Sequence, residues 1–225
     1  MKDNFNQRKK DILSKSDKSS KGNLDKKIIK LCEKINSLKN YYTTSSCSGR
    51  VVLMIDQDKK EKGLFIKVYH NLINFKQLKD DLDKITRASH SRLKESVNNK
   101  NIEDNNIKRR ALTESGSKQL ISERERAKLI KFKQEPCILH IACENLKDAQ
   151  IIYDKAKLVG WKKSGLISFE DRIIVELNST EKLEFPIIEN NKILVNDKFL
   201  KIVVEKSNQN LKKSWEKIER LRKLI

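Results

Sequence analysis

Apolar residues along the chain recur at two spacings, one typical of amphipathic helices and the other of short strands. Helical spacing marks four segments: 23–39, opened by Asn23 and ended by Asn40; 75–85, capped by Asn74; 146–159, ended by Gly160; and the C-terminal segment after 193–195. Short apolar or alternating runs predict strands at 50–55, 64–69, 129–132, 137–143, 165–169, 172–178 and 183–187. The small residues of 43–49 predict a loop between the first helix and the first strand.

The order of these elements defines the expected architecture. A helix–strands–helix half and a strand–helix–strands–helix half flank an insert, without a sequence repeat. We therefore expect one α/β (α+β) domain over 1–225, built on a central mixed sheet flanked by helices. Residues 1–16 are basic and predicted to be partly frayed. Residues 86–118 are rich in Asn, Lys and Ser, which predicts a low-complexity basic insert that does not fold alone.

The chain carries a net charge of +19. The excess of basic residues lies in 1–31, 86–134 and 198–225, and the rest of the chain is balanced. Such basic flanks suit a polyanion, because each neutralised phosphate releases a counterion; the alternative is a Lys-rich surface that is only solvated. No apolar run approaches the ~18 residues of a membrane span, and no signal peptide is evident. We expect a soluble cytoplasmic protein without a membrane partner.

The cysteine pattern argues against a metal centre. None of the cysteines forms a Cys-x-x-Cys pair, and none lies at a zinc-binding distance from a histidine along the chain. Nothing in their spacing indicates a secreted disulfide scaffold. We therefore expect no metal site and four free thiols, mostly in the core: Cys32, Cys47, Cys137 and Cys143.

The segment 41–50, Tyr-Tyr-Thr-Thr-Ser-Ser-Cys-Ser-Gly-Arg, concentrates hydrogen-bonding groups. Gly49 permits a close approach of the backbone, and Arg50 offers a planar fork for a carboxylate or phosphate. A linker that caps its own backbone has the same composition. Tyr41 and Tyr42 suit either stacking on an RNA base or a core position at a helix end. Composition alone leaves these alternatives open.

The same segment resembles a known family. Tyr-Thr-Thr-Ser-Ser-Cys-Ser-Gly-Arg at 42–50, preceded by Asp-Lys-Ser-Ser-Lys-Gly-Asn-Leu-Asp at 17–25, is similar to the N-terminal hallmark of the tRNA wybutosine-synthesising protein 3 family. Glu-Pro-Cys-Ile-Leu-His at 135–140 resembles that family's Glu-Pro-x-Ile-Leu-His strand. Similar motifs follow in the family's order at 164–165, 178–180, 183–187 and 218–221. The resemblance covers roughly 8–85 and 127–222; it departs at Asn178, where the family usually has Arg, and in the insertion-like stretch near 90–118.

This resemblance implies an S-adenosylmethionine-dependent tRNA methyltransferase. The family methylates N4 of a tricyclic base at position 37, in the anticodon loop of phenylalanine tRNA, once that base carries an aminocarboxypropyl chain. The resemblance also implies a fold other than the Rossmann-like methyltransferase fold. The sequence agrees, because it has only six glycines and no Gly-x-Gly-x-x-Gly after a strand.

The candidate site residues come from these motifs. His140, on an apolar strand, is either the base that accepts a proton or a structural histidine, and His70 is a weaker candidate. Arg50 is expected to clamp a carboxylate near the reacting centre. The residues expected to bind cofactor or substrate are Ser45, Ser46, Ser48, Gly49, Arg50, Ser164, Gly165, Ser179 and Thr180. Those expected to bind RNA are Lys18, Lys21, Tyr41, Tyr42, Arg220, Arg222 and Lys223.

Two rival functions fit the same sequence. A non-catalytic RNA-binding protein would carry the same charge but would not bind S-adenosylmethionine. A cysteine-dependent enzyme would use Cys47 near His140 and would need a reactive thiolate. Direct methyl transfer requires no covalent intermediate, so it predicts that Cys47 is dispensable.

Overall fold

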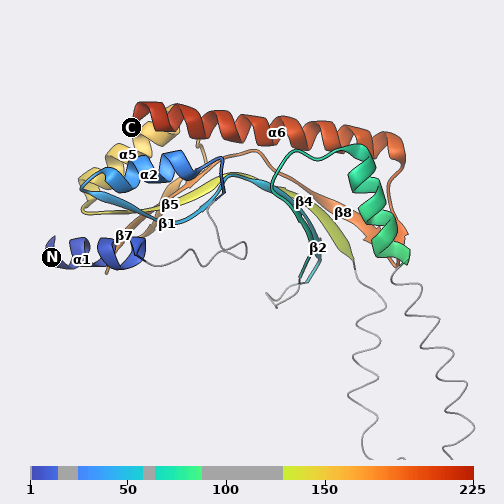
Figure 1. Cartoon of the computed structure of the whole chain (residues 1–225), viewed down its shortest axis with the longest axis horizontal. Helices are drawn as coiled ribbons and strands as arrows, with labels where there is room; N and C mark the ends of the chain where they lie inside the picture. The colour runs from blue at the N-terminus through green and yellow to red at the C-terminus, as the bar shows by residue number, and fades with distance from the viewer. Residues whose placement is uncertain (1, 15–24, 58–63, 88–128) are drawn as a thin grey trace, which may run out of the picture.

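The computed structural model describes residues 2–14, 25–57, 64–87 and 129–225 (Figure 1). Its strands form two sheets. The first sheet has the order β1-β5-β7-β6, and the second has the order β3-β2-β4-β8-β9. Every strand pairing among the described residues is antiparallel. This part of the chain therefore lacks the parallel sheet on which doubly wound nucleotide-binding folds are built.

Three stretches of chain pass directly from one sheet into the other. They are β1 (Tyr41–Cys47) into β2 (Arg50–Ile55), β4 (Ile130–Glu135) into β5 (Ile138–Cys143), and β7 (Ile173–Asn178) into β8 (Leu183–Glu189). The passages lie side by side, since Ser179 donates its backbone N–H to the carbonyl oxygen of Cys137 at 3.1 Å. The two sheets are thus two halves of one bent β-layer, with β3 (Phe65–Tyr69), β6 (Gly165–Ser168) and β9 (Lys192–Ile193) at its edges.

One long helix covers the same side of both sheets. Helix α6 (Asp197–Leu224) runs along the whole bent layer, and α2 (Ile29–Ser37) and α5 (Leu146–Leu158) lie beside it over the first sheet (Figure 1). A helix over 75–87, whose N-cap Asn74 accepts the Gln77 N–H at 2.8 Å, packs on the second sheet. Helix α1 (Lys2–Leu13) lies on the opposite side of the first sheet.

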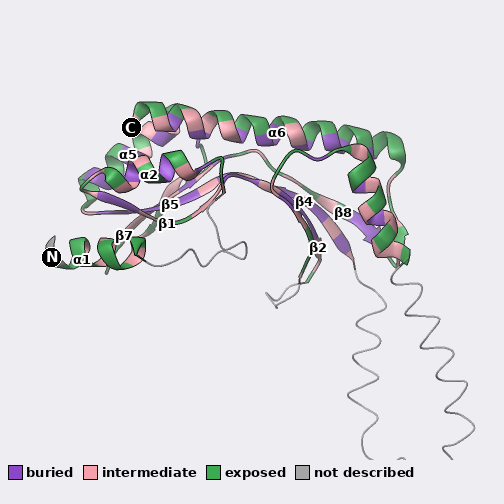
Figure 2. Ribbon diagram, viewed as in Figure 1, coloured by how far each residue is buried: buried purple, intermediate pink, exposed green. Residues whose placement is uncertain are grey.

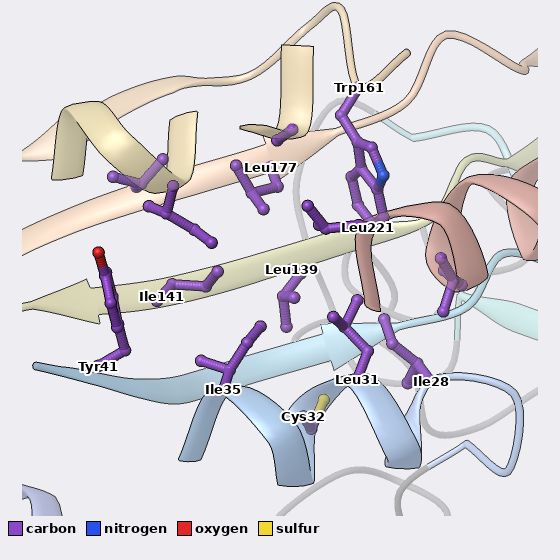
Figure 3. Packing of buried hydrophobic residues seen from close by; sticks show 14 of the residues in the cluster. Ile28, Leu31, Cys32, Ile35, Tyr41, Leu139, Ile141, Trp161, Leu177 and Leu221 are labelled. Atoms are coloured by element: carbon purple, nitrogen blue, oxygen red, sulfur yellow. The ribbon is translucent and has the colours of Figure 1, made fainter. Parts of the chain in front are cut away.

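Two hydrophobic clusters fill the space between the sheets and these helices. In the first, side chains of α2 and β5 converge with Trp161 and with Leu221 of α6 (Figure 3). In the second, alternate residues of β2 and β4 pack on the helix over 75–87 and on the first half of α6. Helix α6 contributes to both clusters, so its inner side is buried and its outer side exposed (Figure 2).

The helix ends follow local sequence signals. Asn145 and Asn196 cap α5 and α6 by accepting backbone N–H groups of Asp148 and Phe199, both at 2.9 Å. Helix α5 ends in a Schellman motif: Gly160, at φ +96°, donates to the Lys157 carbonyl, and the next residue donates to the carbonyl of residue 156. The predicted end of this helix at Gly160 is therefore confirmed.

The α+β class and the absence of a Rossmann-like topology are confirmed, but several details differ. The expected central mixed sheet is a pair of antiparallel sheets. Residues 43–47, predicted as loop, belong to strand β1, because the Thr and Ser side chains suit a half-buried strand as well as a turn. Residues 2–13 form α1 where fraying was expected. Residues 88–118, most of the predicted insert, lie outside the described residues.

Candidate functional site

The side of the β-layer opposite α6, called the open face below, carries a concentration of polar side chains. Because successive residues of a strand point to opposite faces, the residues between the core positions of β2, β4, β5 and β7 project onto it. Among the described residues, only α1 packs on this side. The polar groups of the open face include Ser45, Cys47, His140, Glu176 and Asn178 on the first sheet, and Arg50, Lys131, Lys133, Glu135 and Glu184 on the second.

Three of these side chains form a row across adjacent strands. Ser45 is paired with His140 across β1 and β5, and His140 with Glu176 across β5 and β7. Ser45 Oγ lies 2.8 Å from His140 Nδ1, and His140 Nε2 lies 2.9 Å from Glu176 Oε2. The His140 and Glu176 side chains are both 27% exposed, so the row is partly shielded but reachable from solvent. His140, predicted from its motif, thus lies in a hydrogen-bonded row rather than in the core.

A second polar group lies on the other sheet. Arg50 Nε donates to Glu135 Oε2 at 2.6 Å, and Lys133 Nζ lies 3.1 Å from Glu135 Oε1. Burial alone would raise the pKa of Glu135, but hydrogen bonds and charge from Arg50 and Lys133 outweigh burial and lower it. The terminal amino groups of Arg50 have no hydrogen-bond partner among the described residues. They are therefore available to a ligand carboxylate or phosphate.

The remaining residues of the 45–50 segment divide between the two faces. Ser46 points to the core side of β1, toward α2, and its buried hydroxyl oxygen has no hydrogen-bond partner among the described residues. Ser48 is fully buried at the bend, and its hydroxyl donates to Asp25 Oδ2. Gly49 is also buried at the bend. Ser46 and Ser48 therefore do not project onto the open face with Ser45, because alternation turns Ser46 to the other side of β1 and Ser48 is buried at the bend.

The second group of expected ligand contacts is mainly structural. Ser164 donates to the Trp161 carbonyl at 2.7 Å and accepts the Asn178 N–H at 3.2 Å, which fixes the start of β6. Ser179 is fully buried at the bend, and Thr180 beside it is exposed. Gly165 is paired with Glu176 at the end of the polar row, and its missing side chain leaves open space there.

The residues expected to bind RNA do not gather at one place. Tyr41 is buried, and its hydroxyl donates to the Asp148 carbonyl oxygen at 3.1 Å. Tyr42 is 1% exposed and packs on Phe5 of α1, with the two ring centroids 5.1 Å apart. Tyr41 belongs to the first hydrophobic cluster and Tyr42 is covered by α1 on the open face, so neither ring is exposed in this structure and their role in RNA binding stays a prediction. Arg220, Arg222 and Lys223 lie at the end of α6, on the side away from the open face (Figure 1). Lys18 and Lys21 lie outside the described residues.

A cavity of about 220 Å³ lies on the open face where α1 packs on the first sheet. Its floor includes Tyr42 and Ala142, and Ala142 is two residues from His140 on the same face of β5. Arg8 bridges α1 to the β6–β7 turn by donating to the Asp171 carbonyl at 3.1 Å. The rim is formed by Arg8, Arg172, the 67% exposed Phe169, Asn4, Glu144, Glu170 and Asp171.

Glu176, Glu135 and this cavity were not predicted from the sequence. Glu176 carries a weak signal, because apolar and polar residues alternate over 175–178. Glu135 lies in the family motif and follows Lys133 with the same alternation. The cavity depends on where α1 docks, which no local pattern encodes.

The geometry argues against the cysteine-dependent enzyme. Burial raises the pKa of the Cys47 thiol, although the Gly49 N–H and Arg50 oppose that effect. Burial also raises the pKa of Cys32 to about 11 and those of Cys137 and Cys143 to about 12. All four thiols are free. Both nitrogens of His140 are already engaged by Ser45 and Glu176, so this histidine is not placed to activate Cys47.

The described residues also lack two other kinds of feature. No group of His, Cys, Asp and Glu side chains there is arranged to hold a metal ion. No helix in the same residues is long and apolar enough to cross a membrane.

These features define an α+β protein whose polar site lies on an open sheet face, not at the carboxyl ends of parallel strands. The chain belongs to the methyltransferase TYW3 family, which matches residues 7–225. The resemblance inferred from the sequence motifs is thereby confirmed, and with it the assignment as a methyltransferase.

Individual relatives agree along most of the chain. A protein of Thermococcus sibiricus, named tRNA(Phe) 7-((3-amino-3-carboxypropyl)-4-demethylwyosine(37)-N(4))-methyltransferase, is 28% identical over 96% of this chain and 90% of its own length. A zebrafish (Danio rerio) tRNA wybutosine-synthesizing protein 3 homolog is 28% identical over 97% of this chain and 73% of its own. The solved structure of PH1069 protein from Pyrococcus horikoshii superposes with a TM-score of 0.73 at 26% identity, covering 99% of this chain and 94% of that protein.

Proposed function

We propose that this protein methylates N4 of the 7-aminocarboxypropyl-demethylwyosine base at position 37 of tRNA(Phe), with S-adenosylmethionine as methyl donor. The observation that carries the proposal is the family match over 7–225. A relative named for this reaction agrees with it, because that relative matches this chain over 90% of its own length. The open face supplies the two things that the reaction needs from side chains: an acceptor for the ring-nitrogen proton in the His140 row, and an anchor for a carboxylate in Arg50.

The donor set of the open face fits S-adenosylmethionine. When bound, this cofactor supplies a methyl group on a positively charged sulfur. Its amino-acid end carries a carboxylate and an ammonium, and the modified base carries the same two groups. Arg50 has free amino groups for a carboxylate, and Asn178 Oδ1 is a buried acceptor without a hydrogen-bond partner among the described residues, suited to an ammonium. Arg50 and Asn178 are therefore the residues that we assign to hold amino-acid groups.

The proposed substrate segment is the anticodon loop, where unpaired bases are available for recognition. The cavity under α1 suits such a base, because the exposed ring of Phe169 offers a stacking surface at its rim. Its volume of about 220 Å³ is below the ~300–1,000 Å³ of pockets that bury drug-sized ligands, which favours one base over a whole cofactor. The carboxylates at the rim can accept from N–H groups on a base edge, and the guanidinium groups can contact phosphates.

The salt dependence of RNA binding tests this placement. Replacing Arg8 and Arg172 with Ala should reduce the log–log salt slope by roughly 0.7 for each single-strand phosphate that the protein no longer neutralises. The matched control replaces Arg220 and Lys223, which removes the same charge from the outer side of α6. If both pairs reduce the slope equally, binding follows net charge and the placement on the open face is wrong.

The reaction itself is tested with tRNA from cells that lack this protein. Purified protein and S-adenosylmethionine should add one methyl mass to the tricyclic base, and unmodified tRNA should not react. The rival is a non-catalytic RNA-binding protein, which would bind the same tRNA without consuming the cofactor. Isothermal titration with S-adenosylmethionine separates the two, since the rival predicts no binding heat.

A further inference from the structure

We infer that Ser45, His140 and Glu176 act together as one proton-transfer unit, in which Ser45 faces the substrate and Glu176 positions His140. The inference deepens the proposed methyl transfer and rests on it. Its basis is the row of three directly paired residues on β1, β5 and β7, joined by contacts of 2.8 Å and 2.9 Å. A base oriented by a carboxylate and hydrogen-bonded to a hydroxyl is an arrangement recognised by geometry rather than by sequence order.

The carboxylate determines which nitrogen of His140 carries the proton. An ionised Glu176 can only accept hydrogen bonds, so His140 Nε2 must donate to it across the 2.9 Å contact. In the neutral ring, Nδ1 then holds the lone pair, and the Ser45 hydroxyl must donate to it across 2.8 Å. Asn178 donates to the other carboxylate oxygen of Glu176 at 3.3 Å, which limits rotation of the carboxylate.

Access determines the role of Ser45. Both nitrogens of His140 are occupied, one by Glu176 and one by Ser45, so a proton arriving from a substrate meets the serine oxygen first. Ser45 is the exposed member of the row, and both lone pairs of its oxygen remain available while its hydrogen points to His140. The hydroxyl is therefore the contact point, and His140 is the group that stores the proton.

The proposed step balances as follows. The ring nitrogen forms a bond to the methyl carbon and loses its proton, and the electron pair of the broken carbon–sulfur bond stays on the sulfur of the methyl donor. The nitrogen's proton passes to Ser45 Oγ as the serine proton passes to His140 Nδ1. The resulting imidazolium is stabilised by the adjacent Glu176 carboxylate. Afterwards His140 returns the proton to solvent.

Ser45 is not placed to be an acyl-transfer nucleophile. In α/β-hydrolases the nucleophilic serine lies on a sharp strand-to-helix turn, with backbone N–H groups aimed at the developing oxyanion. Ser45 lies inside β1 and is paired with β5, and β1 continues into β2 and not into a helix. Within the described residues the geometry therefore favours proton transfer over a covalent intermediate.

Within the described ranges, few other charged or titratable groups face His140. On its own face, β5 contributes Ile138 and Ala142, and β1 contributes Cys47. From β7 the facing groups are Glu176 and the neutral Asn178, and β6 contributes Gly165. The nearest cations of the α1 side are Arg8 and Arg172, around the neighbouring cavity. Glu176 is thus the carboxylate whose removal should change the pH response of His140.

The test measures single-turnover methylation against pH for Glu176→Gln, with Glu184→Gln as a carboxylate control on β8. Glu176→Gln should lower the single-turnover rate by roughly 10²-fold or more and leave the KM for tRNA unchanged. It should also move the rising, acidic limb of the pH–rate profile to lower pH, because the imidazolium loses its stabilising charge. Glu184→Gln should behave like the unsubstituted protein. A rate loss without a shift of the limb, or a change in KM alone, would show a structural role and overturn the inference.

A second substitution keeps the inference testable if Glu176→Gln fails to fold. Ser45→Ala should lower the rate at unchanged KM, and Ser45→Thr, which restores a hydroxyl, should recover most of it. Equal rates for Ser45→Ala and the unsubstituted protein would exclude the relay, as would labelling of Ser45 by a fluorophosphonate. If the unsubstituted protein produces no methylated base, the proposed function fails instead; if it does and these variants match it, only the relay fails.

Discussion

Replacing Gly49 with alanine should destabilise the protein more than the same change at any other described glycine. Gly49 has φ +94°, and an added Cβ would lie 3.1 Å from the Glu135 carbonyl oxygen and 3.3 Å from Leu211 Cδ2. The first neighbour is backbone of the adjoining passage between the sheets, and the second is a core side chain of α6. Neither can move without disturbing the bend.

The magnitude follows from two costs. Left-handed backbone costs a non-glycine residue about 1–2 kcal/mol, and overpacking typically costs about 1–3 kcal/mol. Reduced freedom of the unfolded chain offsets about 0.4–1 kcal/mol of this. The net loss in the free energy of unfolding is therefore about 2–4 kcal/mol. At roughly 2–4 °C per kcal/mol for a chain of this length, Tm should fall by about 4–16 °C.

Two other glycines separate these costs in a thermal-unfolding assay. Gly160 has φ +96°, but its nearest neighbour is the flexible end of Lys217, so Gly160→Ala should show mainly the backbone cost. Gly165 has ordinary φ and nothing within 4 Å, so Gly165→Ala should change stability by less than about 0.5 kcal/mol. If Gly49→Ala has the same Tm as Gly160→Ala, the steric part of the reasoning is wrong. If Gly49→Ala has the same Tm as Gly165→Ala, the whole account of the bend is refuted.

Three further predictions concern the open face. The pKa of Glu135 is lowered in the folded state, so its pairing with Arg50 stabilises the protein at pH values above the unfolded-state pKa of Glu135. This stabilisation is lost as the pH falls through the folded-state pKa. The loss of unfolding free energy caused by Arg50→Ala, measured by urea titration, should therefore shrink between about pH 5 and pH 3, and a constant loss would contradict the pairing. Phe169→Ala should weaken binding of an anticodon-loop oligonucleotide by about 1–3 kcal/mol. Leu158→Ala, which removes an even more exposed apolar side chain on α5, should not, and equal effects would remove the cavity from the RNA site. Cys47→Ser should fold and keep most kcat/KM, because burial raises the pKa of that thiol and no thiolate is needed; a folded but inactive variant would restore the covalent rival.

The sequence predicted most elements correctly, and the errors share a cause. Strands such as 50–55 and the helix capped by Asn74 follow from periodicity and capping, which are local. The 43–49 segment is predicted as a loop because hydroxyl residues suit turns, yet pairing with β5 makes most of it a strand. The same limit applies to site residues, because Ser45 and Ser46 are neighbours in sequence but point to opposite faces of β1. The pairing of β1 with β5 decides whether this segment is a strand and which face each side chain takes, and local sequence patterns do not encode that pairing.

The position of α6 after all the strands has a consequence for synthesis. This helix supplies Leu200, Val203 and Val204 to the core of the second sheet, and Ile218 and Leu221 to the core of the first. Each sheet also combines strands from both halves of the chain. Neither half can therefore bury its apolar surface while the other is missing. Because α6 follows every strand along the chain, the apolar faces of both sheets stay uncovered during translation until α6 has emerged from the ribosome.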